Sequence, residues 1–170
     1  MRVTDTHIFF WGGEFSNWYD CQFKYKGLTF FNSEQAFMWE KAIYFGDNKI
    51  AEEILINPDP KLCKKLGRKV KNFNPESWMI VSYSIMVAVN LAKYNQGKHS
   101  NDIRYFKSRR ARRELLETGD KILVEASPYD KIWGIGLGLD NDDCLNEAKW
   151  QGMNLLGKAL MEVRKTLNEE

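Results

Sequence analysis

Apolar residues recur at helical spacing over much of the chain. The clearest case begins at Asn74-Pro75, because asparagine is a good helix cap and proline is tolerated at the first helical position. Large apolar side chains then follow three or four residues apart, which predicts a helix that ends before Gly97. The same pattern, bounded by caps, glycines and prolines, predicts helices from Asn32 or Ser33 to about Phe45, and over Lys49–Ile56, Lys61–Leu66, Asn101–Glu117 and Leu145–Leu167.

Short apolar runs between these helices predict strands. A hairpin is expected where Cys21–Tyr25 and Leu28–Phe31 flank a Lys-Gly pair, since glycine suits a tight turn. Further strands are expected over His7–Trp11, Ile122–Ala126 and the glycine-bearing run Ile132–Leu137. Strands and helices do not alternate regularly, so the order predicts a mainly helical α+β fold with a small sheet surrounded by helices.

Length and composition favour one packed domain over residues 1–170. The hydrophobic fraction is 44% and the aromatic fraction is 14%, values that exclude a disordered chain. No apolar run is long enough to span a membrane. The first residues contain one basic residue and no extended apolar stretch, so no signal peptide is expected and a cytoplasmic location is predicted.

Cysteine and histidine are too few and too scattered for a metal centre. Three cysteines lie far apart and form no Cys-x-x-Cys pair, and the only histidines are His7 and His99. Neither a disulfide framework nor a zinc site is expected, and no cofactor is predicted. A nucleophilic Cys–His pair stays open as an alternative, although nothing in the sequence favours one.

The net charge of +2 hides two strongly basic stretches. Such stretches can bind phosphate groups, but they are more often solvated helix faces. They consist of Lys61, Lys64, Lys65, Arg68, Lys69 and Lys71, and of Lys107, Arg109, Arg110, Arg112 and Arg113.

The helix that begins at Ser33 carries charged residues where apolar ones are expected. On a helical wheel, Glu34 and Lys41 fall on the same side as Phe37, Met38 and Phe45. A charge among apolar side chains is costly unless it is paired or used. The alternative is that Glu34 interacts with the helix dipole in the first turn and that Lys41 extends to the surface.

The spacing of Glu34 and Lys41 suggests a shared substrate. They are seven residues apart, so their Cα atoms lie roughly 10 Å apart along the helix axis. A direct ion pair is therefore not expected, whereas a substrate can bridge them. The helix N-terminus favours the anionic form of Glu34, and apolar neighbours lower the pKa of Lys41, which makes its neutral amine available as a nucleophile.

Several short motifs, in order along nearly the whole chain, resemble the NADAR or YbiA-like superfamily. Each motif is weak alone, but the set is specific. The matching segments are Phe15-Ser16-Asn17-Trp18-Tyr19, Ser33-Glu34-Gln35-Ala36-Phe37 with Lys41-Ala42, Leu66-Gly67-Arg68, Leu116–Gly119 with Leu123–Ala126, Asp130–Leu137, Asn146-Glu147 and Trp150–Gly157.

The resemblance implies hydrolysis of an N-glycosidic bond between ribose C1 and an exocyclic amino nitrogen. Family members resemble either enzymes that remove ADP-ribose from guanine bases or hydrolases of ribosylamino-pyrimidine intermediates of riboflavin synthesis. The glutamate and lysine of the family map to Glu34 and Lys41, and its Asp-x-x-Trp-Gly motif maps to Asp130, Trp133 and Gly134. The bulky residues before Lys41 depart from many members, which bears on the shape of the pocket.

The predicted catalytic residues are thus Glu34 and Lys41, with Asp130 as a second acid or base or as a turn residue. Arg68 is expected to bind substrate phosphate. Trp133 either stacks on a base or packs in the core. The remaining expected binding residues are Gly134, Trp11 and Gly12, where backbone is exposed; Asn17, which also suits an Asx turn; and Glu125, which alternates with apolar neighbours in a strand.

The expected function is removal of ADP-ribose from guanine or hydrolysis of a related ribosylamino substrate. The partner is then ADP-ribosylated nucleic acid or a phosphorylated ribosylamino small molecule. The first alternative is a riboflavin-intermediate hydrolase, and the second is a non-catalytic module that binds ADP-ribose or a nucleotide. No sequence feature indicates a membrane partner or an oligomeric state.

Overall fold

A computed structural model describes residues 1–96, 98 and 102–169 of the chain. Gly97, His99 and Asn101, which entered the sequence-based expectations, lie outside the described residues. The chain divides into two compact units, each described here by itself. Unit 1 comprises Met1–Ser16 and Arg113–Glu170, and unit 2 comprises Asn17–Arg112. The expectation of one domain over residues 1–170 stays a prediction.

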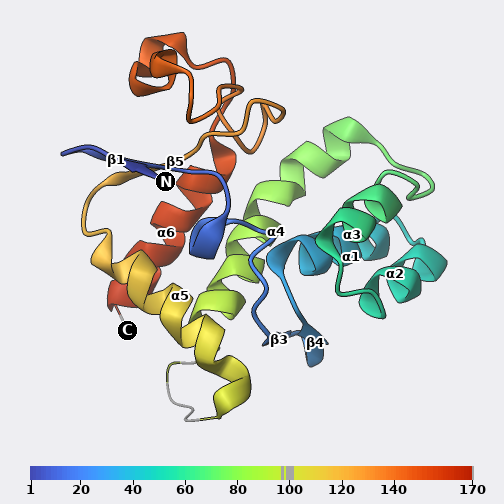
Figure 1. Ribbon diagram of the computed structural model, residues 1–170. Coiled ribbons are helices and arrows are strands. Elements are labelled where there is room, and N and C mark those ends of the chain that lie inside the picture. Colours follow the sequence, from blue (N-terminus) through green and yellow to red (C-terminus); the bar gives the residue numbers. More distant parts are fainter. Residues whose placement is uncertain (97, 99–101, 170) are drawn as a thin grey trace. The chain divides into compact units, whose positions relative to one another are not determined.

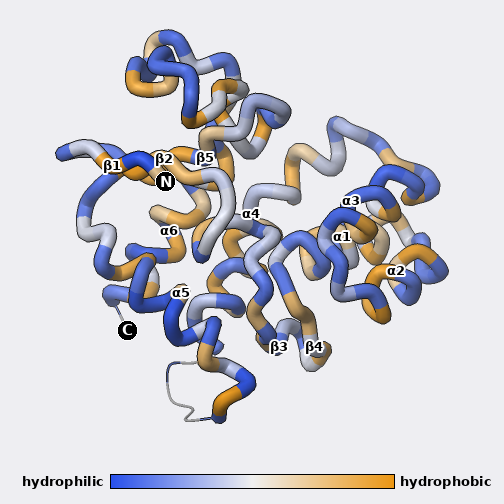
Figure 2. The backbone as a smooth tube through the Cα atoms, viewed as in Figure 1, coloured by the Kyte–Doolittle hydropathy of each residue, from blue (hydrophilic) through white to orange (hydrophobic). Residues whose placement is uncertain are grey.

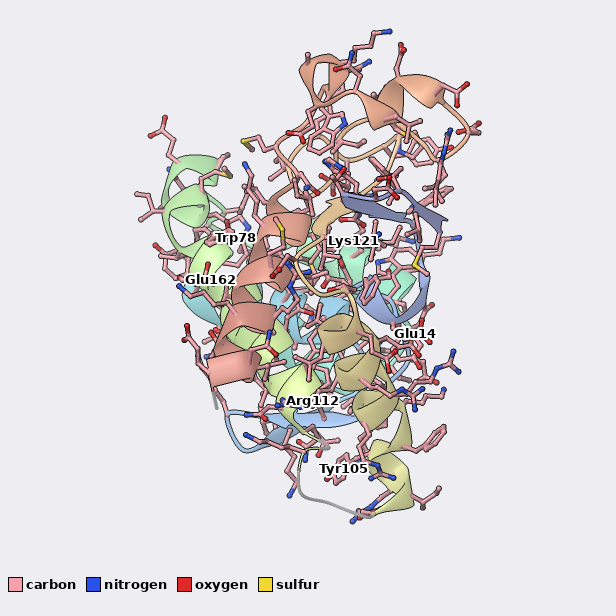
Figure 3. All side chains as sticks on the ribbon, turned by 90° about the vertical axis from the view of Figure 1, so that its left-hand side faces the viewer. Glu14, Trp78, Tyr105, Arg112, Lys121 and Glu162 are labelled. Carbon is pink, nitrogen blue, oxygen red and sulfur yellow. The ribbon has the colours of Figure 1, made fainter. Side chains whose placement is uncertain are left out.

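Unit 1 is built on a three-stranded sheet in the order β1-β2-β5. The bounds are Arg2–Val3 for β1, His7–Phe10 for β2 and Ile122–Glu125 for β5, and β1 was not predicted. The central strand β2 pairs with β1 antiparallel and with β5 parallel. Lys121, labelled in Figure 3, directly precedes β5. Its Nζ donates to the carbonyl of Thr4, in the connection between β1 and β2, at 2.5 Å.

Helix α6, Leu155–Glu169, packs closely against β5. A Cβ atom at Gly157 would lie 2.0 Å from the carbonyl oxygen of Leu123, so only glycine allows this approach. Arg164 of α6 also donates to Thr118 Oγ1 at 2.7 Å and to the carbonyl of Lys121 at 2.8 Å. The apolar core of unit 1 is formed by Phe9, Val124, Ala126, Ile135, Leu137 and Cys144.

The predicted strand over Ile132–Leu137 is wrong, because this segment is an irregular loop. Its backbone is hydrogen-bonded, but not in the regular ladder of a sheet strand. Ile135 N donates to the carbonyl of Glu125 at 3.0 Å, and the carbonyl of Ile135 accepts from Gln151 N at 2.8 Å. Gly136 has a φ of 71°, which is incompatible with an extended strand. The apolar side chains enter the core from a loop instead.

The predicted helix over Leu145–Leu167 is wrong in its first half. Two short 3-10 turns, Asp142–Leu145 and Glu147–Lys149, precede the helix, which begins only at Leu155. Asn154 has a φ of 53°, outside the right-handed helical region. Its side chain instead accepts from Glu125 N at 3.0 Å and donates to the carbonyl of Leu123 at 2.9 Å, which ties the segment to β5.

Unit 2 begins with the predicted hairpin. Strands β3, Phe23–Tyr25, and β4, Leu28–Phe30, pair antiparallel around Lys26 and Gly27, which have φ values of 49° and 79°. Two successive positive φ values are those of the tight turn that suits the twist of a hairpin. The core beneath the hairpin consists of Cys21, Phe23, Phe30, Ala36 and Val89.

Four helices follow the hairpin, and the first contacts the other three (Figure 1). Of the two residues expected to begin the first helix, Asn32 is the cap, since its side chain accepts from Gln35 N at 2.8 Å. Gln35 Oε1 in turn accepts from Phe31 N at 2.9 Å, one residue before the position expected for a capping box. The helices are α1, Ser33–Tyr44; α2, Asn48–Leu55; α3, Pro60–Gly67; and α4, Pro75–Asn95.

The basic segment after α4 forms a 3-10 turn, Ile103–Tyr105, followed by α5, Phe106–Glu117. Figure 2 shows α5 mostly in the hydrophilic colour. The observed elements confirm the mainly helical α+β fold with a small sheet. Within the described residues, no helix combines the length and the apolar character needed to cross a membrane.

Candidate functional site

Glu34 and Lys41 both lie on α1 of unit 2. This helix is buried on nearly all sides, and only 7% of Glu34 is exposed. The backbone amide of Glu34 donates to the carbonyl of Asn17 at 2.9 Å, which anchors the first turn of α1 to the segment before the hairpin. Glu34 is therefore a buried carboxyl group at a helix N-terminus, where the dipole favours its anionic form.

Asn17 lies in a buried network of polar side chains. Its Oδ1 accepts from Asn90 Nδ2 at 3.3 Å, and its Nδ2 lies 3.4 Å from the sulfur of Met86. Asn90 Oδ1 accepts from Ser33 Oγ at 3.1 Å, so the network reaches the residue before Glu34. Sequence reasoning missed Asn90. The signal in the sequence was a polar asparagine close to the apolar residues Met86 and Val89, which are buried in α4. The network positions α1; a direct contact of Asn17 with substrate stays a prediction.

The ammonium group of Lys41 is half-buried and lies over an aromatic ring. Its Nζ is 3.9 Å from the centroid of Phe73, a residue that the sequence did not single out. Burial lowers the pKa of Lys41, the positive charge of Arg68 lowers it further, and the negative charge of Glu34 opposes both effects. The expected decrease of this pKa is therefore present, and part of it comes from Arg68.

Arg68 follows α3 and is exposed. Helix α3 packs against α1 just before Arg68, and a Cβ atom at Gly67 would lie 2.1 Å from the sulfur of the Met38 side chain. Met38 lies between Glu34 and Lys41 in the sequence of α1. Unit 2 thus brings together the charges of Glu34, Lys41 and Arg68.

The cysteines are unsuited to nucleophilic attack. Within the described residues all three are free and buried. Burial, followed by the charge of Glu34, raises the pKa of Cys63 to about 12, and its Sγ donates to the carbonyl of Asn57 at 3.2 Å. Burial also raises the pKa of Cys21 and Cys144. Thiols in such surroundings stay protonated near neutral pH, so the alternative of a nucleophilic cysteine is not supported.

The predicted residues of unit 1 gather at the carboxyl ends of β2 and β5. Trp11 and Gly12 follow β2, and Glu125 is the last residue of β5, paired with Phe10 in the parallel register. Carboxyl ends of neighbouring parallel strands lie at the same edge of a sheet, where loops commonly bind ligands. The loop with Asp130, Trp133 and Gly134 starts at this edge.

Asp130 organises the backbone of this loop. Its Oδ1 accepts from Ile132 N at 2.9 Å and from Trp133 N at 2.8 Å, and its carbonyl accepts from Gly136 N at 3.1 Å. This is the arrangement of an Asx turn, the alternative role expected from the sequence. One carboxylate oxygen is thus committed to the fold, and a catalytic role for Asp130 stays a prediction.

Gly134 is required by close packing. A Cβ atom there would lie 2.9 Å from the carbonyl oxygen of Asp130 and 3.0 Å from that of Glu125. The neighbouring Trp133 is half-buried, and its carbonyl accepts from Leu156 N at 3.0 Å. Backbone hydrogen bonds therefore hold the loop that presents Trp133.

The predicted site residues form two groups, one in each unit. Unit 2 holds Glu34, Lys41, Arg68 and Asn17, and unit 1 holds Trp11, Gly12, Glu125, Asp130, Trp133 and Gly134. A substrate cleft that joins Glu34 and Lys41 to Asp130 and Trp133 involves both units and stays a prediction. In the part of the chain that the structure describes, no group of three or more His, Cys, Asp or Glu residues could hold a metal ion.

Comparison with known proteins assigns the family. The sequence profile of the NADAR domain matches residues 9–168, nearly the whole chain. The chain belongs to the NADAR family. This assignment confirms the resemblance found in the short motifs.

Relatives of this NADAR protein include an N-glycosidase of Acanthamoeba polyphaga mimivirus. It is 37% identical over 95% of this chain and 96% of that protein. A riboflavin biosynthesis protein of Vibrio vulnificus is 26% identical over 92% of this chain, which spans only 36% of that longer protein. The NMR structure of the Escherichia coli protein YbiA has a TM-score of 0.73 and 29% identity, and the match covers 99% of this chain and 88% of that one.

Proposed function

We propose that this NADAR protein removes ADP-ribose from guanine bases, or from a related ribosylamino substrate, by cleaving the bond between ribose C1 and an exocyclic amino nitrogen. The class of the enzyme, a hydrolase of N-glycosyl bonds, follows from the family and from the mimivirus relative named N-glycosidase. The substrate and the roles of individual residues are the proposal.

One observation supports Lys41 as the reacting group: its amine is half-buried, ordered over Phe73 and carries a lowered pKa. A lysine reacts as a nucleophile only in its neutral form. The burial of Lys41 and the charge of Arg68 both increase the neutral fraction near physiological pH.

In the proposed reaction, the ribose ring of the substrate first opens to an imine at C1. The neutral amine of Lys41 adds to C1, and the carbon–nitrogen bond to the base then breaks as the leaving amine takes up a proton. A Schiff base between Lys41 and C1 results. Addition of water to this Schiff base releases the sugar as an aldehyde and restores the free amine.

Glu34 is proposed to transfer the protons. Its carboxylate accepts a proton from the Lys41 amine as that amine adds to C1, and gives this proton to the leaving nitrogen. It then accepts a proton from the attacking water as a general base. The anchoring of Glu34 N by the carbonyl of Asn17 supports a fixed position for this group. A positioned acid or base contributes about 10²–10⁴-fold to a rate.

Direct hydrolysis is the alternative chemical route. In that case Glu34 stabilises an oxocarbenium-like state or activates water, and Lys41 and Arg68 bind substrate phosphate as charges. The two routes differ in whether a covalent bond to Lys41 forms. They do not differ in the products released.

A phosphorylated ribosylamino-pyrimidine of riboflavin synthesis is the second candidate substrate. The relative from Vibrio vulnificus, named as a riboflavin biosynthesis protein, favours it. An assay that offers both guanine-ADP-ribosylated oligonucleotide and the ribosylamino-pyrimidine phosphate, with products followed by mass, separates the two. We expect release of ADP-ribose from the oligonucleotide. If the protein cleaves neither of the two substrates, the proposed function is contradicted.

The nucleic-acid substrate has a further signature. If the modified base lies in DNA, activity should decrease as salt increases, and neutralisation of Arg109, Arg110, Arg112 and Arg113 should raise KM. If the substrate is the small pyrimidine phosphate, the same four substitutions should change little.

Borohydride reduction in the presence of substrate tests the covalent route. We expect a stable adduct at Lys41 in the wild type and none in Lys41→Arg, while Glu34→Gln loses about 10²–10⁴-fold in kcat. Lys49→Arg, an exposed lysine on α2, is the matched control and should retain full activity. An active preparation that forms no adduct at Lys41 contradicts the Schiff-base route and favours direct hydrolysis.

The non-catalytic alternative makes a different prediction. A binding module should bind ADP-ribose equally well before and after Glu34→Gln, and the wild-type protein should release no product from either substrate. Measuring binding and turnover on the same preparations therefore distinguishes a binding module from an enzyme.

A further inference from the structure

Two large aromatic side chains of unit 1 contact each other while staying exposed to water. Trp11 is 55% exposed and Tyr129 is 85% exposed. Their ring centroids are 6.0 Å apart, and the ring planes meet at 54°. Apolar side chains stabilise a fold through the surface they remove from water, so the fold of unit 1 gains little from holding this exposed pair.

The pair lies at the carboxyl edge of two parallel strands. Trp11 directly follows β2, and Tyr129 lies in the loop that follows β5. Phe10 and Glu125 are register partners, and Ala126 N donates to the carbonyl of Phe10 at 2.8 Å. The two loops therefore leave the sheet side by side, which is the place where parallel sheets commonly bind ligands.

The backbone beside Trp11 is open. Gly12 has a φ of 103° and a ψ of −171°, a conformation that only glycine adopts readily. Gly13 has a φ of 68°, and apart from adjacent parts of the chain no atom lies within 4 Å of a Cβ atom built on either glycine. Space for a ligand is thus present next to the indole ring.

The loop that presents Tyr129 is held by hydrogen bonds. Tyr129 N donates to Ser127 Oγ at 3.3 Å, and the Asx turn of Asp130 follows directly. The phenol ring is therefore exposed on an anchored segment. An anchored, exposed aromatic ring is suited to stacking, since little conformational entropy is lost on binding.

We propose that Trp11 and Tyr129 form a stacking surface for a nucleobase of the substrate. The rings already contact each other, so the base stacks on the outer face of the pair. The base is either the adenine of ADP-ribose or an unpaired base next to the modified guanine. This inference rests on the proposed function only for the kind of ligand; the stacking itself follows from the exposure and contact of the two rings.

Calorimetric binding of three uncleaved probes tests the proposal: ADP-ribose, ribose 5-phosphate and an unmodified single-stranded oligonucleotide. Base–aromatic stacking is worth about 1–3 kcal/mol per base, or roughly five- to 150-fold in affinity. We expect Trp11→Ala and Tyr129→Ala each to weaken a probe that contains the stacked base by such a factor. Tyr129→Phe should restore the affinity. Phe106→Ala removes an aromatic of 54% exposure on α5 and is the matched control.

The pattern among the probes identifies the base. If the substitutions weaken the affinity for ADP-ribose but not for ribose 5-phosphate, the surface binds adenine. If they weaken the affinity for the oligonucleotide alone, the surface binds a flanking base. The proposal is overturned if the substitutions leave the affinity for both base-containing probes unchanged, or if they weaken the binding of ribose 5-phosphate equally. It is also overturned if the wild-type protein binds neither base-containing probe. Because no probe is cleaved, a protein without N-glycosidase activity that shows this stacking contradicts the proposed function and not the stacking surface.

Discussion

The Nζ atom of Lys41 lies 3.9 Å from the centroid of the Phe73 ring. The two residues are far apart in the sequence, with α2 and α3 between them. The negative face of an aromatic ring attracts an ammonium group, so this contact both holds the amine in place and favours its charged form. Burial and Arg68 act in the opposite direction and lower the pKa of Lys41. The protonation of the proposed nucleophile is therefore set by opposing contacts.

Changing Phe73 should shift this balance. Leucine keeps the apolar volume but removes the ring, so Phe73→Leu should lower the pKa of Lys41 further and lose about 0.5–1 kcal/mol of attraction. NMR titration of the Lys41 side chain measures the pKa. Phe73→Tyr keeps the ring and should leave the pKa near that of the wild type. An increase in the pKa after Phe73→Leu would show that the ring acts mainly by excluding water.

The two charges near Lys41 should have opposite effects on its pKa. Arg68→Gln removes a positive neighbour, so the pKa of Lys41 should rise; Glu34→Gln removes a negative neighbour, so it should fall. If the neutral amine is the nucleophile, the acidic limb of kcat/KM should move to higher pH in Arg68→Gln. Arg68→Lys keeps the charge and serves as the control. A pH profile that stays in place while only KM rises would reduce Arg68 to a phosphate-binding role.

Removal of the Asn90 side chain should destabilise unit 2 and disturb α1. Asn90→Ala leaves Ser33 Oγ and Asn17 Oδ1 without their bonds to this side chain in a buried setting. The expected loss is about 1–3 kcal/mol in the free energy of unfolding, measured by urea denaturation. Ser84→Ala, at an exposed position of the same helix, should stay within about 0.5 kcal/mol of the wild type. Equal effects of the two substitutions would argue against the network.

Gly152→Ala should destabilise the loops of unit 1 that carry Trp133. The added Cβ atom would lie 2.3 Å from the carbonyl oxygen of Gly134 and 2.8 Å from backbone atoms of Lys131. Backbone atoms cannot rotate away, so overpacking is expected to lower the free energy of unfolding by about 1–3 kcal/mol. Thermal unfolding measures this loss. At Gly138 the nearest atom, 2.6 Å away, belongs to the movable side chain of Asp140, so Gly138→Ala should cost much less. A melting temperature unchanged by Gly152→Ala would contradict the close packing.

Helix α4 and the hairpin were predicted well because their signals are local. The asparagine and proline that begin α4, and the Lys26-Gly27 turn, act within a few residues, and the structure places both as expected. The loop over Ile132–Leu137 was mistaken for a strand because its apolar pattern is that of a strand. Its backbone partners are Glu125 and Gln151, which periodicity does not reveal.

The sequence by itself determined the helical periodicity of α1 and the presence of Glu34 and Lys41 on one side, since these depend on the rotation per residue along one helix. It narrowed the cap of α1 to Asn32 or Ser33. It also identified the family through motifs in order. Only the tertiary structure decided that Phe73 lies against Lys41 and that Arg68 shares the electrostatic surroundings of this lysine. It also decided that Asn90 anchors the start of α1 and that Trp11 contacts Tyr129. These contacts join segments distant in the chain, and close packing rather than local propensity brings them together.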